Sequence, residues 1–218
     1  MDWDALLIGL LSCGAVRGAY TLLDARLRVH ARAYATLKPH KQKYVVKNMI
    51  KAMYLAVLLA GAVPLVLVPI ARDGHWYSAR IRRFGMLYVS NDAVGLACVP
   101  RLPTTTRIHH CVTICLVVAA MAIDFQTSDV GQAMLVYTVA SAAAYVVNLH
   151  LAARWLLRDT ETLRKTAAVI YAICCAVSWT WHLHWAWHRA LRLPHLVYLG
   201  LLTAIVRDDL VLMRWLAR

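Results

Sequence analysis

The chain of 218 residues is 61% hydrophobic and only 16% charged, and its mean hydropathy is +0.56. A soluble domain is about 45–50% apolar and roughly 25% charged, so this composition excludes a soluble protein, a disordered chain, collagen and a small disulfide scaffold. Lys and Arg number 24 against 11 acidic residues, which gives a net charge of +13. The composition therefore predicts a polytopic membrane protein with a basic excess that needs an explanation.

Apolar runs recur along the whole chain. A helix needs about 20 mainly apolar residues to cross a hydrocarbon core about 30 Å thick. Seven segments are predicted to span the membrane: residues 5–23, 44–70, 84–99, 108–123, 133–157, 166–188 and 195–216. We expect an all-α fold, with one transmembrane helix and a basic cytosolic loop over residues 1–43 and a six-helix membrane domain over residues 44–218. The acidic start of the chain favours a retained first helix over a signal peptide.

The basic residues cluster in the loops between these segments. If the loop after the first segment lies inside, fourteen Lys and Arg lie in or beside inside loops and six outside. Four enter the spans, namely Arg17, Lys47, Lys51 and Arg207. The positive-inside rule then predicts an N-terminus outside or in a lumen and a C-terminus in the cytosol. Membrane topology thus explains the net charge, and we expect no nucleic-acid partner.

Several polar residues fall inside the predicted spans, where ionisable side chains are costly and often functional. Five of the seven spans place such residues in the same inner half of the bundle. They are Lys47, Lys51, Asp92, His109, His110, Asn148, His150, Asp208 and Asp209. This pattern predicts a polar cavity. Lysine snorkelling to the headgroups, a helix–helix hydrogen bond from Asp92 and an ordinary acidic pair at a helix end are the alternatives.

The adjacent histidines His109 and His110 are the sharpest feature. Neighbouring helical residues point about 100° apart, so we expect only one of them to face a central cavity. Thr113, one turn further on, is expected to orient either ring. A neutral imidazole near a carboxylate suits general-base or nucleophilic chemistry near pH 7. A purely structural pair at a helix interface is the alternative.

Two further groups of residues carry less chemical information. His184 and His188 share a helix face, but they lie among four tryptophans at the outer end of the sixth span. Tryptophan is enriched at membrane interfaces, so an aromatic belt is the favoured interpretation and we predict no metal site. The six cysteines all fall in predicted spans, where cysteine behaves as a small apolar residue.

Three strings resemble the TLC (TRAM–LAG1–CLN8) domain family. They are KNMIK at residues 47–51, SNDAVGL at 90–96 and LPTTTRIHHCVT at 102–113. The resemblance extends from about residue 45 to residue 216 and includes the arrangement of one extra helix before a six-helix core. Ceramide synthases of this family carry a His-Asp-x-x-Asp element on the following helix. Residues 136–141 read VYTVAS instead, so the chain is closer to the divergent members of the family.

The resemblance implies a function in lipid metabolism or homeostasis in the endoplasmic reticulum membrane, with membrane lipids as partners. It implies that His109 and His110 are the paired catalytic histidines and that Asp92 orients one of them. Among the other polar residues of the inner half, Asp209 is an alternative orienting carboxylate, and we expect Lys47, Lys51, Asn148 and Asp208 to hold the substrate. An N-acyltransferase of this kind would bind no cofactor but would use acyl-CoA as its co-substrate. A lipid sensor or binding protein without enzymatic activity is the first alternative, and a small transporter or channel is the second.

Overall fold

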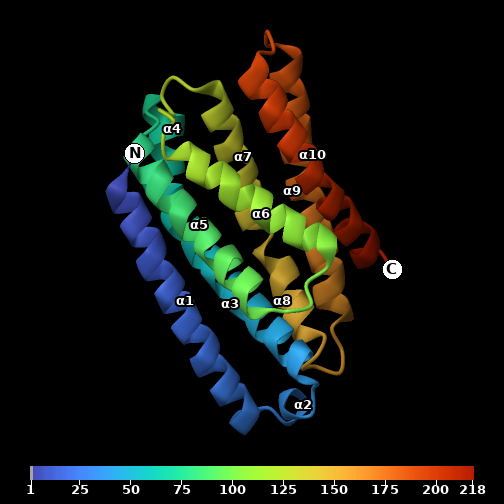
Figure 1. Ribbon diagram of the computed structural model, residues 1–218. Coiled ribbons are helices and arrows are strands. Elements are labelled where there is room, and N and C mark those ends of the chain that lie inside the picture. Colours follow the sequence, from blue (N-terminus) through green and yellow to red (C-terminus); the bar gives the residue numbers. More distant parts are fainter. Residues whose placement is uncertain (1) are drawn as a thin grey trace.

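The computed structural model describes residues 2–218 and is all-α, as the sequence predicts (Figure 1). The described chain contains no β-strand. The helices are α1 (Trp3–His30), α2 (Arg32–Ala35), α3 (Pro39–Ala62), η1 (Val63–Leu67), α4 (Val68–Asp73), α5 (Ser78–Cys98), α6 (Thr104–Ala120), α7 (Asp129–Ala143), α8 (Tyr145–Ala153), α9 (Glu161–Trp187) and α10 (Leu193–Leu216). Each predicted span overlaps one of these helices or a continuous run of them.

Four helical segments are long and apolar enough to cross a bilayer, so the chain is an integral membrane protein. They are Trp3–His30, Pro39–Asp73, Asp129–Ala153 and Glu161–Trp187. The other long helices, α5, α6 and α10, carry most of the polar residues of the candidate site. The count of seven spans stays a prediction, as does the division of the chain at residue 43.

Local sequence explains several helix ends and bends. The side chain of Asp2 accepts a hydrogen bond from the backbone of Ala5, which caps α1. Ser128 caps α7 in the same way. Pro64 lies in the π-helical turn η1 between α3 and α4, where its missing N–H removes a helical hydrogen bond. Gly74 ends α4 with φ of 67°, a conformation that glycine adopts without a Cβ clash.

The connections alternate between the two ends of the bundle (Figure 1). The N-terminus, α4 and the α9–α10 connection lie at one end, while α2 and the α5–α6 and α8–α9 connections lie at the other. We call these the outer end and the inner end. This alternation fits the predicted topology, although which end faces the cytosol stays a prediction.

The first helix packs along the bundle rather than standing apart from it (Figure 1). Gly9 permits the close approach of α1 to α5, because a Cβ there would lie 2.5 Å from Cε of Met86. The hydroxyls of Ser12 and Tyr54 lie 2.6 Å apart. Tyr20 donates a buried hydrogen bond of 3.1 Å to Asn91. Helix α1 therefore supports the stretch of α5 that precedes Asp92.

Two features of the bundle position the candidate site. Helix α6 packs against both α5 and α10, so successive residues of α6 can face different neighbours. The long segment predicted as a single span at residues 133–157 breaks at Ala144, between α7 and α8, and its helix ends at Ala153. The break gives the segment a bend beside the interior, and Ala144 itself lines the cavity described next.

Candidate functional site

A cavity of about 320 Å³ lies in the inner half of the bundle. Its walls come mainly from α3, α6, α8 and α10, with contributions from the end of α7 and from α9. Seven of the eight site residues predicted from the sequence line it, namely Lys47, Lys51, His109, His110, Asn148, Asp208 and Asp209. The eighth, Asp92, lies behind the wall and contacts two of these residues. The structure thus brings all eight together, while their chemical roles remain proposals.

Asp92 joins two helices across the wall of the cavity. Its side chain is fully buried, and Oδ1 accepts a hydrogen bond of 2.5 Å from Nζ of Lys51. Its Oδ2 lies 3.1 Å from Nδ1 of His110, at ion-pair distance but without the alignment of a hydrogen bond. Lys51 compensates the buried carboxylate, which would otherwise be strongly destabilising. Lys51 therefore does not snorkel to the headgroups.

Neither ring nitrogen of His110 forms a hydrogen bond in residues 2–218, and Nε2 also lacks an ion-pair contact. Only 3% of the residue is exposed, and Nε2 has no hydrogen-bond partner within residues 2–218. Although His110 lines the cavity, Nε2 itself is buried, so an occupant of the cavity can become its partner only when neighbouring side chains shift. A neutral imidazole can present either a lone pair or an N–H there. The arrangement suits proton transfer to or from a bound molecule.

His109 forms a second contact with a carboxylate, on α10 rather than on α5. Its Nδ1 lies 3.4 Å from Oδ2 of Asp208 on α10. Thr106 donates a hydrogen bond of 3.2 Å to the other oxygen of Asp208. The two imidazole rings are 5.5 Å apart and nearly perpendicular. Both histidines line the cavity, so the expectation that only one would face it is wrong.

Two other expected contacts differ in the structure. Thr113 orients neither imidazole ring, since its hydroxyl donates to the backbone carbonyl of His109. Asp209 accepts a buried hydrogen bond of 2.8 Å from Tyr171. In the described chain it is Asp208, and not Asp209, that lies within ion-pair distance of an imidazole.

Lys47 and Arg154 bring two cationic side chains to the cavity, which is also lined by the carboxylates of Asp208 and Asp209. Neither Lys47 nor Arg154 forms an ion pair in the described part of the chain. Lys47 is only 4% exposed, and its aliphatic stem packs beside Gly95 of α5. The guanidinium of Arg154 lies over the ring of Trp215, 4.5 Å from its centroid. An anionic group of a bound molecule could pair with both cations.

Sequence reasoning missed several residues of this cavity. In the sequence, Arg154 is simply one of the fourteen basic residues in or beside the inside loops. Tyr44, Tyr171 and Trp215 carry no motif. Trp215 lies two turns after Asp208 on α10, whereas α9, which carries Tyr171, holds no predicted site residue. The i, i+3 spacing is the signal that could have found Tyr44, which lies three residues before Lys47.

The histidines of the outer end form separate contacts. In His182, Nδ1 lies 2.7 Å from the carbonyl oxygen of Ser178, and Nε2 lies 2.8 Å from the hydroxyl of Tyr198. His195 lies 3.1 Å from Asp129 and accepts a hydrogen bond from the backbone of Arg192. These contacts hold α9, α10 and the start of α7 together. His184 and His188 are exposed, with ring centroids 4.4 Å apart.

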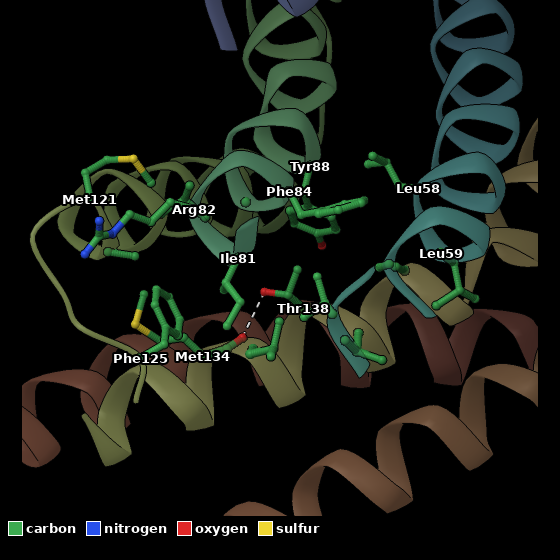
Figure 2. Close-up of a pocket in the computed structure, with 18 residues that line it drawn as sticks. Leu58, Leu59, Ile81, Arg82, Phe84, Tyr88, Met121, Phe125, Met134 and Thr138 are labelled. Atoms are coloured by element: carbon green, nitrogen blue, oxygen red, sulfur yellow. Dashed lines mark hydrogen bonds between the residues drawn. The ribbon is translucent and has the colours of Figure 1, made fainter. Parts of the chain in front are cut away.

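A second, apolar pocket of about 60 Å³ lies towards the outer end (Figure 2). Side chains from α3, α5 and α7 converge on it, including Leu58, Phe84 and Thr138. The hydroxyl of Thr138 is paired with the carbonyl of Met134 at 2.8 Å. Arg82 at the edge donates to the carbonyl of Ile123. The polar groups at this pocket are therefore largely satisfied by the protein.

Comparison with known proteins gave no match to a family model, a curated protein or a solved structure.

Proposed function

We propose that this membrane protein binds a lipid in the inner cavity and transfers an acyl group from acyl-CoA to the amine of that lipid, as a divergent TLC-like protein. The observation that carries the proposal is the buried Nε2 of His110, which has no hydrogen-bond partner in residues 2–218 and belongs to the wall of a polar cavity, with Asp92 behind the same ring. This arrangement supplies a base, a carboxylate near it and space for a substrate.

The cavity also has the chemistry needed to hold the two substrates. Lys47 and Arg154 offer cationic partners for phosphate groups of acyl-CoA. Asn148 offers an amide that can donate to or accept from a headgroup. Apolar walls from Leu55, Leu151 and other residues can contact an acyl chain. In the predicted topology this cavity faces the cytosol, where acyl-CoA is found, and the membrane is that of the endoplasmic reticulum.

The proposed reaction joins a lipid amine to the acyl group of an acyl-CoA thioester. The lipid amine forms a bond to the thioester carbonyl carbon while Nε2 of His110 takes a proton from the amine nitrogen. The C–S bond breaks, and the imidazolium returns this proton to the leaving thiolate. The products are an amide and free coenzyme A. Asp92 stabilises the transient positive charge on His110, and Lys51 keeps Asp92 ionised in the apolar interior.

A lipid-binding protein without enzymatic activity is the second candidate. The observation that favours it is the burial of Lys51 and Asp92 in a direct ion pair, a contact that can specify how helices pack without taking part in chemistry. This candidate predicts that lipid still binds when His110 is replaced by alanine.

Acyl transfer is tested by incubating purified protein with labelled acyl-CoA and a panel of amine and alcohol lipids. We expect labelled amide, and a loss of about 10²–10⁴-fold in rate for His110→Gln. The matched control is His150→Gln, because His150 is also a buried histidine of the inner half but does not line the cavity. Lipid binding without transfer by the wild type would favour the second candidate. Absence of both lipid binding and transfer would overturn the proposal.

A further inference from the structure

The polar cavity and the apolar pocket follow one another along the same helix faces. On α3, the cavity is lined by Lys51 and Leu55, and the pocket by Leu58 and Ala62. These positions are three or four residues apart, so they lie on one face of the helix. The distance along α3 from Lys51 to Ala62 is about 16 Å at 1.5 Å per residue. Helix α3 thus provides one wall for both spaces.

Two other segments show the same succession. On α6, His109 and His110 line the cavity, while Val117 and Ala120 line the pocket. On the α7–α8 segment, the pocket is lined by residues from Met134 to Ala142 and the cavity by residues from Ser141 to Arg154. The two spaces therefore lie end to end in the interior of the bundle, polar at the inner end and apolar towards the outer end.

Tyr88 and Ser141 connect the walls of the two spaces. Tyr88 on α5 lines the pocket, Ser141 on α7 lines the cavity, and their hydroxyl oxygens lie 2.8 Å apart. Tyr88 is 3% exposed. Figure 2 shows Tyr88 beside Phe84 on α5, with Leu58 of α3 nearby. The hydroxyl contact therefore joins a wall of the apolar pocket to a wall of the polar cavity.

We propose that the apolar pocket takes the distal end of an acyl chain whose polar end lies in the cavity, and that the Tyr88–Ser141 pair limits chain length. The inference rests on the proposed function, because it needs a lipid in the cavity. A short acyl chain ends within the polar cavity, before it reaches Tyr88 and Ser141. A longer chain displaces the tyrosine ring and enters the pocket between α3, α5 and α7.

The chemistry of the pocket agrees with a hydrocarbon occupant rather than a second headgroup. Its lining is mostly aliphatic and aromatic, and the hydroxyl of Thr138 is already paired within its own helix. The charged Arg82 donates two hydrogen bonds to the carbonyl of Ile123, at 2.6 and 3.2 Å, and lies 3.7 Å from Asp2. Apolar chains gain free energy in proportion to the apolar surface removed from water, so each further methylene in the pocket strengthens binding.

The test compares lipids with the same amine headgroup and acyl chains of different length, added to purified protein and measured by native mass spectrometry. Ala62→Phe fills the pocket from a half-buried position. We expect it to weaken binding of the long-chain lipid about tenfold and to leave the short-chain lipid unchanged. The matched control is Ala60→Phe, the same substitution at an exposed position of the same helix that lines neither space.

A second pair of variants tests the hydroxyl pair itself. Tyr88→Phe keeps the ring and removes its bond to Ser141, so we expect the preference to shift towards longer chains by a few-fold. Tyr54→Phe is the control, because it removes a similar Tyr–Ser contact, that with Ser12, away from both spaces. The four variants are compared at equal amounts of folded protein.

The outcomes separate this inference from the function on which it rests. If the wild type binds no lipid at all, the proposed function fails together with the inference. If lipid binds but Ala62→Phe affects short and long chains alike, or affects neither, only the limit on chain length is overturned. Equal shifts in Tyr88→Phe and Tyr54→Phe would also contradict it.

Discussion

The inner and outer ends of the bundle bury histidine in opposite ways. At the outer end, both ring nitrogens of His182 have partners within the protein, a carbonyl and a tyrosine hydroxyl. At the inner end, His110 lies against a carboxylate in the wall of a cavity, and its buried Nε2 has no hydrogen-bond partner in residues 2–218. A histidine whose hydrogen bonds are complete stabilises the fold, whereas a buried nitrogen without a partner in a cavity wall calls for another explanation, such as a ligand. The inner end is therefore the candidate site of function.

The largest effect on stability is expected from separating the buried ion pair of the inner end. Lys51→Met leaves Asp92 buried without its cation and should lower the free energy of unfolding by about 3–5 kcal/mol. Chemical unfolding in detergent measures this loss. Lys43→Met, at an exposed position about two turns earlier on α3, is the control. A loss below about 1 kcal/mol for Lys51→Met would show that Asp92 is neutral or solvated, which contradicts its proposed charge.

An intermediate effect is expected at the outer end. His182→Leu removes two hydrogen bonds and leaves the hydroxyl of Tyr198 and the carbonyl of Ser178 without this partner, at a cost of about 2 kcal/mol. His110→Leu leaves the Lys51–Asp92 pair intact and should cost less. The same unfolding measurement compares the two variants. If His110→Leu is the more destabilising, the inner histidine is chiefly structural and the contrast between the ends is lost.

The smallest effect on stability is expected at a single carboxylate, that of Asp124. Asp124, in the turn between α6 and α7, is held by hydrogen bonds from Ser78, from the backbone of Gln126 and from Thr127, and these lower its pKa. A carboxyl group whose pKa is lower in the folded state adds stability above its unfolded pKa of about 3.9 and loses it as the pH falls through the folded value.

Asp124→Asn should therefore lower Tm at pH 7 and have less effect as the pH falls below about 4. Thermal unfolding of both proteins between pH 7 and pH 3 measures the difference. A difference that is constant across this range would show that the hydrogen bonds do not depend on the charge of Asp124.

The sequence was sufficient to predict the all-α membrane fold, because long apolar runs have few alternatives in a bilayer. It also predicted that polar residues from five helices would gather in the inner half, since topology assigns each residue a depth. It could not predict which neighbour each residue contacts. Asp208 and Asp209 are adjacent in sequence, and only the rotation of α10 decides that Asp208 faces His109 while Asp209 faces Tyr171.

The apolar pocket was not predicted, because a space between helices depends on how side chains of different sizes fit together. Arg154 was missed for another reason. A basic residue beside a loop is ordinary in membrane proteins, and its place over the ring of Trp215 depends on where α8 ends and how α10 crosses it. Depth and periodicity can be inferred from sequence, whereas helix rotation and packing require the structure.

The central claim is that the inner cavity binds a lipid, and photo-crosslinking tests it most directly. Purified protein is irradiated with an amine lipid that carries a photoactivatable group on its acyl chain, and the adducts are located by peptide mass spectrometry. The account predicts adducts on cavity residues such as Leu55 and Leu151, which an unlabelled lipid of the same kind suppresses. Adducts confined to exposed positions such as Leu7 and Val169 would contradict it, because those side chains lie on the outer surface of the bundle.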